Sequence, residues 1–335
     1  MLKRNLALLG LIMSLSSHAD NRNFVFFGDT QVGASENTHF TTTYTPLIFG
    51  NTYITAGTNA EVYGDMVSNT YLVTGAGAIV EGNIQTGTAV TTGVNTGVKG
   101  NINASTAITL GASSVVDGTV CYNTALTLGA GSTTGGYNCS LSTKTYNRDQ
   151  VLAAQDSYNA LTTELTGVSN HLEPTMPLNV VLNPYEDSAN IIGINTVVYD
   201  AVSLTTAAGI TLTLNGDYDW VFNIRDMLSL GAGTKIVLAN GSSGSVTWNI
   251  GGYASIGAHA EIVGTILANG YISTGANSKI TAAGAYSVSS NSNQSYCGGL
   301  FSATSYVTLG ASSTVRCVQD NMQDNGFSIP FLTPW

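Results

Sequence analysis

A glycine recurs every eighteen residues in the first half of this chain, and this period limits the folds open to it. These repeat glycines are Gly57, Gly75, Gly93, Gly111 and Gly129. An aliphatic residue lies three positions before each of them, and a valine or a threonine lies five positions after. A constant period with constant apolar positions means that each repeat adds one similar layer to a stack. We expect the aliphatic side chains to pack inside the stack and the glycines to form corners that a Cβ would crowd.

One coil with three short sides accommodates such a repeat, so the sequence predicts a mainly β fold, a three-sided β-solenoid of about 18 residues per coil. Leucine-rich repeats are excluded because no helix fits between the strands, and calcium-binding nonapeptide repeats because GGxGxD is absent. The same pattern returns after residue 225, at Gly231, Gly257, Gly275 and Gly310. Unequal gaps between these glycines indicate coils with insertions, which we place at 240–245 and 289–299.

Residues 147–167 interrupt the repeats with a helical pattern. Apolar residues with a three–four spacing would share one face of a helix, namely Val151, Ala154, Tyr158, Leu161 and Leu165. Gly167 can end the helix. Such a helix needs a partner, so we expect one long α-helix packed alongside the solenoid. Residues 171–184, which contain prolines, are expected to connect it back to the sheet.

The first nineteen residues have the features of a cleaved secretory signal. Lys3 and Arg4 precede an apolar run that is too short to span a bilayer, and small residues follow at the expected cleavage point. We expect residues 20–335 to form a single domain of a secreted protein without a transmembrane segment, whether extracellular, periplasmic or attached to the cell surface. Its expected parts are coils at 24–145, the helix, coils at 185–317 and a tail at 318–335.

Charged residues make up only 9% of the chain, against about a quarter of an ordinary domain. The net charge is −10, and no basic stripe could neutralise phosphates, which excludes a nucleic-acid partner. The densest acidic group is Asp217, Asp219 and Asp226, where a turn explains the first two. Since the histidines share no motif either, the sequence predicts no enzyme and no cofactor.

Four cysteines can form disulfides, and they are Cys121, Cys139, Cys297 and Cys317. Three connectivities are possible. Pairing of near neighbours, Cys121 with Cys139 and Cys297 with Cys317, is the simplest in an oxidising compartment, and four free buried thiols are the alternative. The absence of a CxxC spacing and of a nearby histidine pair argues against a zinc site.

The order of these parts resembles the ice-binding protein family of cold-adapted bacteria, fungi and algae. The matching residues are AAQDSYNAL (153–161), GDYDWVFNI (216–224) and the stretch 246–280. The resemblance implies a discontinuous, right-handed solenoid in which the first and last chain segments build one body, with the helix alongside. It also implies a flat side that faces ice. The very regular early coils and the unmatched tail from Gln319 depart from the family pattern.

One outward position of the coil bears hydroxyl groups almost throughout. It lies two residues before each repeat glycine and next to the inward aliphatic residue, so its side chain should face water. Apart from Val73, the residues there are Thr55, Thr91, Thr109, Thr127, Ser229, Ser255, Ser273 and Thr308. Strands stack about 4.7–4.9 Å apart, so these candidate ice-binding residues would form a regular row. Their methyl and hydroxyl groups could together order water into an ice-like layer, and many weak contacts would make attachment firm.

Two alternatives stay open. Threonine suits strands, so the row could stabilise the sheet without binding anything. Nearby tyrosines could bind glycans, in a non-catalytic cell-surface or matrix adhesin for carbohydrate or protein. A second threonine ladder, five residues before each repeat glycine, is interpreted as a turn feature.

We expect a monomer whose partner is the ice surface and which inhibits ice growth or recrystallisation.

Overall fold

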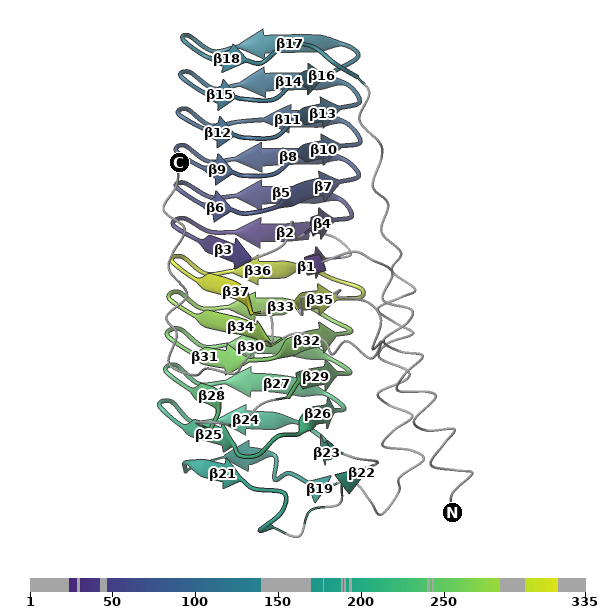
Figure 1. Ribbon diagram of the computed structural model, residues 1–335, viewed down its shortest axis with the longest axis vertical. Coiled ribbons are helices and arrows are strands. Elements are labelled where there is room, and N and C mark those ends of the chain that lie inside the picture. Colours follow the sequence, from purple (N-terminus) through teal and green to yellow (C-terminus); the bar gives the residue numbers. More distant parts are fainter. Residues whose placement is uncertain are drawn as a thin grey trace, which may run out of the picture.

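The protein is a three-sided β-solenoid in the computed structural model (Figure 1). The residues that the structure describes are 24–28, 31–42, 47–139, 170–176, 178–187, 189, 191–192, 195–239, 242, 244–283 and 299–318. Within these residues, each coil contributes one strand to each of three sheets, which contain 13, 12 and 12 strands and are parallel except for one short strand. We name these sheets A, B and C in the order in which the chain visits them.

The spatial order of the strands in each sheet differs from their order in the sequence. Sheet A consists of β16 (Val120–Cys121), β13 (Ile102–Ala104), β10 (Ile84–Thr86), β7 (Asp65–Ser68), β4 (Leu47–Gly50), β1 (Phe24–Gly28), β35 (Leu300–Ser302), β32 (Thr265–Ala268), β29 (Val246–Ile250), β26 (Asp219–Ile224), β23 (Thr196–Ala201) and β19 (Asn170–His171). A further strand, β22 (Ile191–Ile192), pairs antiparallel with β23. Sheet B consists of β17 (Ala125–Leu128), β14 (Ala107–Leu110), β11 (Ala89–Thr91), β8 (Tyr71–Thr74), β5 (Tyr53–Ala56), β2 (Gln31–Ala34), β36 (Val307–Leu309), β33 (Ile272–Thr274), β30 (Tyr253–Ile256), β27 (Met227–Leu230), β24 (Leu204–Thr206) and β20 (Thr175–Met176). Sheet C consists of β18 (Thr133–Thr134), β15 (Val115–Val116), β12 (Gly97–Val98), β9 (Ile79–Val80), β6 (Glu61–Val62), β3 (His39–Thr42), β37 (Thr314–Val318), β34 (Lys279–Ala283), β31 (Glu261–Val263), β28 (Lys235–Leu238), β25 (Thr211–Leu214) and β21 (Val180–Leu182).

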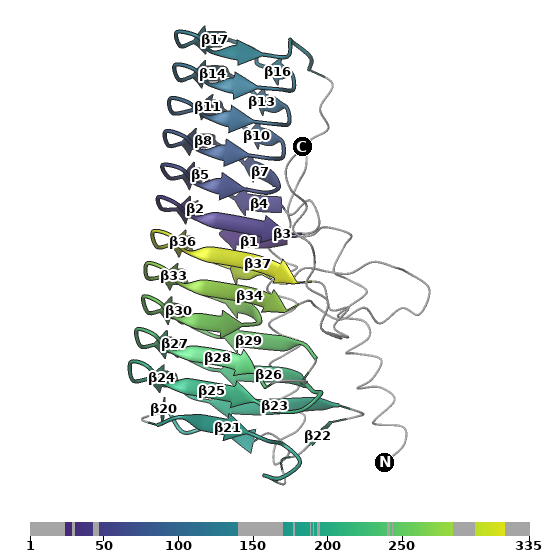
Figure 2. The same cartoon turned by 60° about the vertical axis from the view of Figure 1, so that its left-hand side comes forward.

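The chain enters this stack in the middle. Strands β1–β3 pair on one side with β4–β6 and on the other with β35–β37, the last coil (Figure 2). The early coils continue to one end of the solenoid at β16–β18, and the later coils begin at the opposite end with β19–β21 (Figure 1). We refer to β1–β18 as the N-terminal half and to β19–β37 as the C-terminal half. The solenoid is therefore discontinuous, as the family resemblance implies.

The core confirms the inward positions predicted from the repeat. Ile54, Leu72, Val90 and Ile108, each three residues before a repeat glycine, are at most 1% exposed. In the C-terminal half, aromatic residues of the long strands β23, β26 and β29 fill the interior. The rings of Phe222 and Trp248 are stacked with centroids 4.1 Å apart, and the Trp248 Nε1–H donates to the Val263 carbonyl oxygen at 2.9 Å.

Glycine occupies most of the corners where consecutive coils turn from sheet B to sheet C, because a side chain there would meet the backbone of the adjacent coil. A Cβ on Gly93 would lie 2.4 Å from the carbonyl carbon of Gly75 in the coil beneath, closer than atoms can pack. Two residues after each repeat glycine the backbone adopts a left-handed conformation, for example at Asn59 (φ 52°) and Ser113 (φ 56°). His259 has the same position in its coil and the same conformation (φ 58°). Asn, Gly and Ser predominate there because they tolerate positive φ better than most residues.

Variation in coil length is concentrated at the corner between sheets C and A. Both expected insertions fall there, one between β28 and β29 and the other between β34 and β35. The corner between sheets B and C keeps four residues in most coils, such as 57–60, 111–114 and 231–234. Sheet B and its corner with sheet C therefore stay regular along the solenoid.

The expectation of a long packed α-helix is wrong as part of the fold class. Every element in the described part of the chain is a β-strand. Residues 147–167, for which the spacing predicts the helix, lie outside the described residues, as do the expected signal segment and the tail from Gln319. The three–four spacing shows only which side chains would share a face in a helix, and a helix's stability comes largely from tertiary packing that no spacing supplies.

Residues 171–184, expected to form a connector, contain most of the terminal coil, β19–β21. Their three strands pair with β23, β24 and β25. None of the described segments is a helix long and apolar enough to cross a membrane.

Candidate functional site

The structure places all eight predicted hydroxyl residues in one row on sheet B. In the N-terminal half, strand pairing aligns Thr55, Val73, Thr91, Thr109 and Thr127. In the C-terminal half it aligns Ser229, Ser255, Ser273 and Thr308. Gly33 in the first coil joins the two series, because it pairs with both Thr308 and Thr55. We name this column the hydroxyl row.

The row has two further members that the repeat glycines do not identify. Thr205 pairs with Ser229, and Thr175 pairs with Thr205, so the row spans both halves from end to end. The coil of Thr205 has Ala207 where a repeat glycine would stand, and a search for glycines misses it. Leu204 and Leu212, three residues before and five after Ala207, keep the apolar spacing and could have revealed this coil.

The hydroxyl row differs from other threonines in its hydrogen bonds. Within the described residues, none of the eight predicted side-chain hydroxyls bonds to another protein group. In the second ladder, the Thr106 hydroxyl donates to the Thr88 carbonyl oxygen at 2.9 Å, and that of Thr88 donates to the Thr70 carbonyl oxygen at 2.5 Å. These bonds fasten bends of neighbouring coils, in agreement with the turn interpretation. The hydroxyl row keeps its hydrogen-bonding capacity for solvent.

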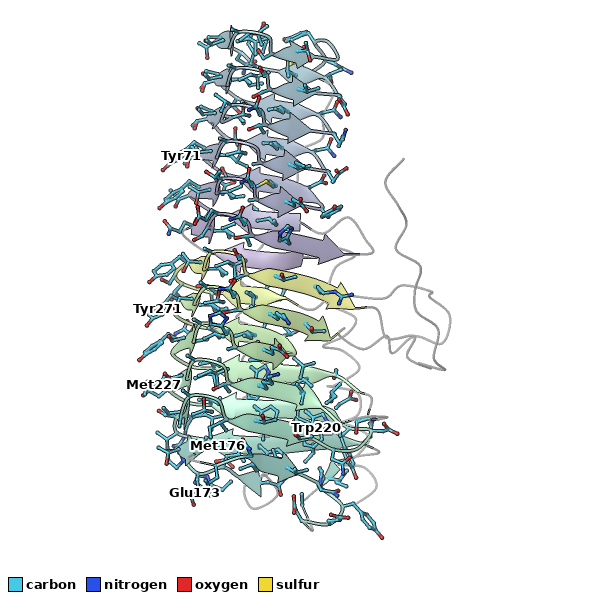
Figure 3. All side chains as sticks on the ribbon, turned by 90° about the vertical axis from the view of Figure 1, so that its left-hand side faces the viewer. Tyr71, Glu173, Met176, Trp220, Met227 and Tyr271 are labelled. Atoms are coloured by element: carbon cyan, nitrogen blue, oxygen red, sulfur yellow. A yellow bond between two sulfur atoms is a disulfide. The ribbon has the colours of Figure 1, made fainter. Side chains whose placement is uncertain are left out.

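A second outward column runs beside the row, two residues earlier in each strand. Its tyrosines are stacked, with ring centroids 5.0 Å apart for Tyr53–Tyr71, 4.7 Å for Tyr253–Tyr271 and 5.3 Å for Tyr271–Tyr306. Tyr71, Tyr271 and Met227 project along the same edge of the solenoid (Figure 3). Burial raises the pKa of Tyr271, and the adjacent Tyr253 and Tyr306 add to this effect. The tyrosine rings of this column cover one another's faces.

In the last three coils of the N-terminal half this second column consists of Ala89, Ala107 and Ala125. The row residues beside them, Thr91, Thr109 and Thr127, are exposed, whereas the serines of the C-terminal half are only partly exposed. No strand of sheet B contains a charged residue or a histidine. The result is a surface of short, uncharged side chains at a constant spacing.

Among the described residues, neither sheet A nor sheet C is both exposed and uncharged along its whole length. On sheet A, Phe49 and Val67 point away from the core but are each only 3% exposed, and Asn249 is 2% exposed. Sheet C bears ion pairs between neighbouring coils, including Lys279 Nζ to Glu261 Oε1 at 3.2 Å. Sheet B is thus the exposed and uncharged side of the solenoid.

Sequence comparison agrees with this architecture. A family model described as Ice-binding-like matches residues 129–315, which is more than half of the chain. The chain belongs to the ice-binding-like family. This result confirms the resemblance that the motifs indicated. No curated protein sequence matches the chain significantly.

Several solved structures are similar to this ice-binding-like protein. An ice-binding protein from the Antarctic ascomycete Antarctomyces psychrotrophicus is 16% identical, over 90% of this chain and 96% of that one, with a TM-score of 0.41. A glycosylated ice-binding protein from an Arctic yeast is 16% identical over 70% and 94% of the two chains, with a TM-score of 0.33. The DUF3494 domain of an ice-binding protein from Shewanella frigidimarina is 21% identical over 65% and 93%, with a TM-score of 0.30. With TM-scores below 0.5, these likenesses support no argument about this chain.

Two residues of the acidic group in the ice-binding-like protein, Asp219 and Asp226, accept hydrogen bonds from neighbouring coils. Asp219 Oδ1 accepts hydrogen bonds from the Ser245 N–H at 3.1 Å and the Ser245 hydroxyl at 2.8 Å in the next coil. Asp226 Oδ2 accepts one from the Ser203 hydroxyl at 3.2 Å. Among the described residues, no group of His, Cys, Asp and Glu is arranged to hold a metal ion.

One disulfide closes the end of the N-terminal half. Cys121 and Cys139 are bonded, with an S–S distance of 1.98 Å, which confirms the short-range pairing for these two. They lie 18 residues apart, one coil along the chain. The predicted Cys297–Cys317 pair lies outside the residues and side chains that the structure describes.

Proposed function

We propose that this protein binds ice by adsorption through sheet B and so inhibits ice growth or recrystallisation. The supporting observation is the hydroxyl row, whose side chains are regularly spaced, uncharged and free of hydrogen bonds to described protein groups. Membership of the ice-binding-like family adds independent support. No bond is made or broken in this activity, so it requires neither a catalytic group nor a cofactor.

The physical basis is the ordering of surface water. Threonine methyl groups hold water in cages, and the adjacent hydroxyls anchor those cages by hydrogen bonds. Each contact is weak, but many contacts made at the same time by successive coils hold the protein on ice much more strongly than any one of them. Strand pairing fixes the spacing of these contacts, and the absence of charge in the strands of sheet B leaves the water layer undisturbed.

The N-terminal half is the expected centre of contact. Around Thr109 the row has alanine as its outer neighbour, whereas around Ser255 and Ser273 it has stacked tyrosines. A flat lattice can approach short side chains evenly, and a projecting ring beside a serine prevents this. The adhesin alternative has no observation in its favour, because the stacked tyrosines have few ring faces left for sugars.

We also propose that the protein is secreted and monomeric, with residues 1–19 as its signal peptide. The Cys121–Cys139 disulfide supports passage through an oxidising compartment. The apolar run and the small residues at the start of the sequence support export.

The test measures thermal hysteresis and ice recrystallisation with purified protein. We expect the parent to be active and the double variant Thr91→Tyr/Thr109→Tyr to lose most of its activity. The matched control, Lys99→Tyr/Asp117→Tyr, also introduces two tyrosines into the same two coils, but on the side of sheet C. This control should retain activity. Ser255→Tyr should have a smaller effect than Thr109→Tyr alone. An inactive parent would refute ice binding, and an active threonine variant would exclude sheet B as the contact face.

A further inference from the structure

In the N-terminal half the uncharged surface does not end at the edge of sheet B. In the outer four coils, the corner that follows it presents small apolar residues one position after the repeat glycine, namely Ala76, Val94, Ala112 and Ala130. The first outward column of sheet C then presents Ile79, Gly97, Val115 and Thr133. These eight residues are named the corner surface. Three of them are branched apolar side chains with large exposed fractions: Val94 (47%), Val115 (42%) and Ile79 (37%).

The corner surface is as regular as the hydroxyl row. Strand pairing aligns Gly97 with both Ile79 and Val115. At the corner itself, the Asn95 N–H donates to the Ala112 carbonyl oxygen at 2.9 Å, and equivalent bonds link the coils above and below. Each coil is thus fastened to the next on both sides of the corner, and this rigidity is what a crystalline partner requires.

Charge marks the limit of this surface. In the C-terminal half, the same column of sheet C contains Lys235, Glu261 and Lys279, which form ion pairs. The charged part of this column continues into the first coils of the N-terminal half, where His39 contacts Glu61 at 2.9 Å. From Ile79 onward the charges begin only two residues further along the strand, where Lys99 pairs with Asp117 at 3.0 Å. The protein therefore places uncharged residues on this column only in the outer four coils of the N-terminal half.

We propose that the ice-contact surface of the N-terminal half continues around this corner and forms a second plane of contact with ice. The inference rests on the proposed function and extends it. Continuity with the hydroxyl row argues for ice as the occupant, as do the regular spacing and the absence of charge. Exposed apolar groups in a contiguous patch indicate an interaction surface, and here their methyl groups would hold ordered water as the threonine methyl groups do. Two planes at an angle would let one molecule attach to two orientations of the ice lattice.

The test uses fluorescently labelled protein and a single ice crystal, on which the planes that take up label are recorded. The variant is Val94→Lys/Val115→Lys, and the control is Tyr63→Lys, which adds a lysine to an exposed site on sheet C beyond the charge limit. Thermal unfolding of each variant verifies that the fold is retained. We expect the parent to label two sets of planes, the double lysine variant to lose one set and the control to keep both.

The outcomes separate the two proposals. If Thr91→Tyr/Thr109→Tyr loses ice binding while the double lysine variant labels every parent plane with unchanged hysteresis, the corner surface is refuted and sheet B stands. An inactive parent refutes both. Light scattering gives the oligomeric state of the parent and of the variant Val115→Lys. If the parent is a dimer and the variant is a monomer, a second copy of the chain covers the corner, and this proposal is also refuted.

Discussion

The two halves of the solenoid share one strand register but differ in interior and surface. The N-terminal half repeats every eighteen residues and has an aliphatic core, whereas the C-terminal half varies in coil length and stacks Phe222 on Trp248. On sheet B and its corner with sheet C, the last three coils of the first half present threonine, alanine and valine. The second half presents stacked tyrosines on sheet B and ion pairs on sheet C. Backbone pairing sets the overall shape in both halves, while the outward residues, which pairing does not constrain, decide what the surface contacts.

The largest expected effect is in the aromatic core. Trp248→Ala should cost about 3–5 kcal/mol of unfolding free energy, because the site is enclosed on all sides and cannot collapse around the cavity. Ile102→Ala, the corresponding change in the N-terminal half, removes fewer atoms and should cost toward the lower end of about 2–5 kcal/mol. Denaturant titration measures both. Equal losses of unfolding free energy would mean that the two cores contribute equally to stability.

Removal of the disulfide should have an intermediate effect, confined at first to one end. Cys121→Ser/Cys139→Ser opens an 18-residue loop, for which chain entropy predicts a loss of about 3 kcal/mol. Among the described residues, the coil β16–β18 is the outermost of this half and has only an isolated bridge from Val120 to Tyr137 on its outer side. Amide hydrogen exchange should therefore rise there before it rises near β1–β3. A uniform rise along the solenoid would contradict this local role.

The smallest expected effect concerns the ion pairs of the C-terminal half. Glu261 contacts Lys279 and Lys235 at 3.2 and 3.9 Å, but these side chains are 33–67% exposed. Glu261→Gln should therefore cost only about 0.2–1 kcal/mol, and less at high salt. Unfolding at low and high salt checks this. A larger, salt-independent loss would show that Glu261 supports the sheet in another way.

Much of the fold follows from the repeat because each coil has the same physical requirements. Leu72 and Val90 had to face inward, and Thr91 and Thr109 outward, once the period was known. The coil that contains Thr205 was not predicted, because Ala207 replaces the repeat glycine at its corner. The apolar spacing of this coil, unlike the glycine, is intact.

Other features depend on contacts between coils that one sequence does not display. The stacking of Tyr271 on Tyr306 requires the register of two strands separated by an irregular connection. The burial of Phe49 and Val67 on the outside of sheet A likewise follows from tertiary packing. The helix prediction relied on apolar spacing, a terminal glycine and the family resemblance, and none of these demonstrates that the segment packs as a helix.

The seam between the first and last coils has a consequence for how the protein is made. Phe40 pairs with Val315, so the central layer of the stack joins the two most distant parts of the domain. Coils within each half can assemble from contacts close in sequence, but the seam must wait until nearly the whole chain has been synthesised, and closing so long a loop is slow. Until then β1–β3 and β35–β37 expose unpaired strand edges, which invite aggregation. Folding of this protein should accordingly be limited by one late docking step between two preassembled halves.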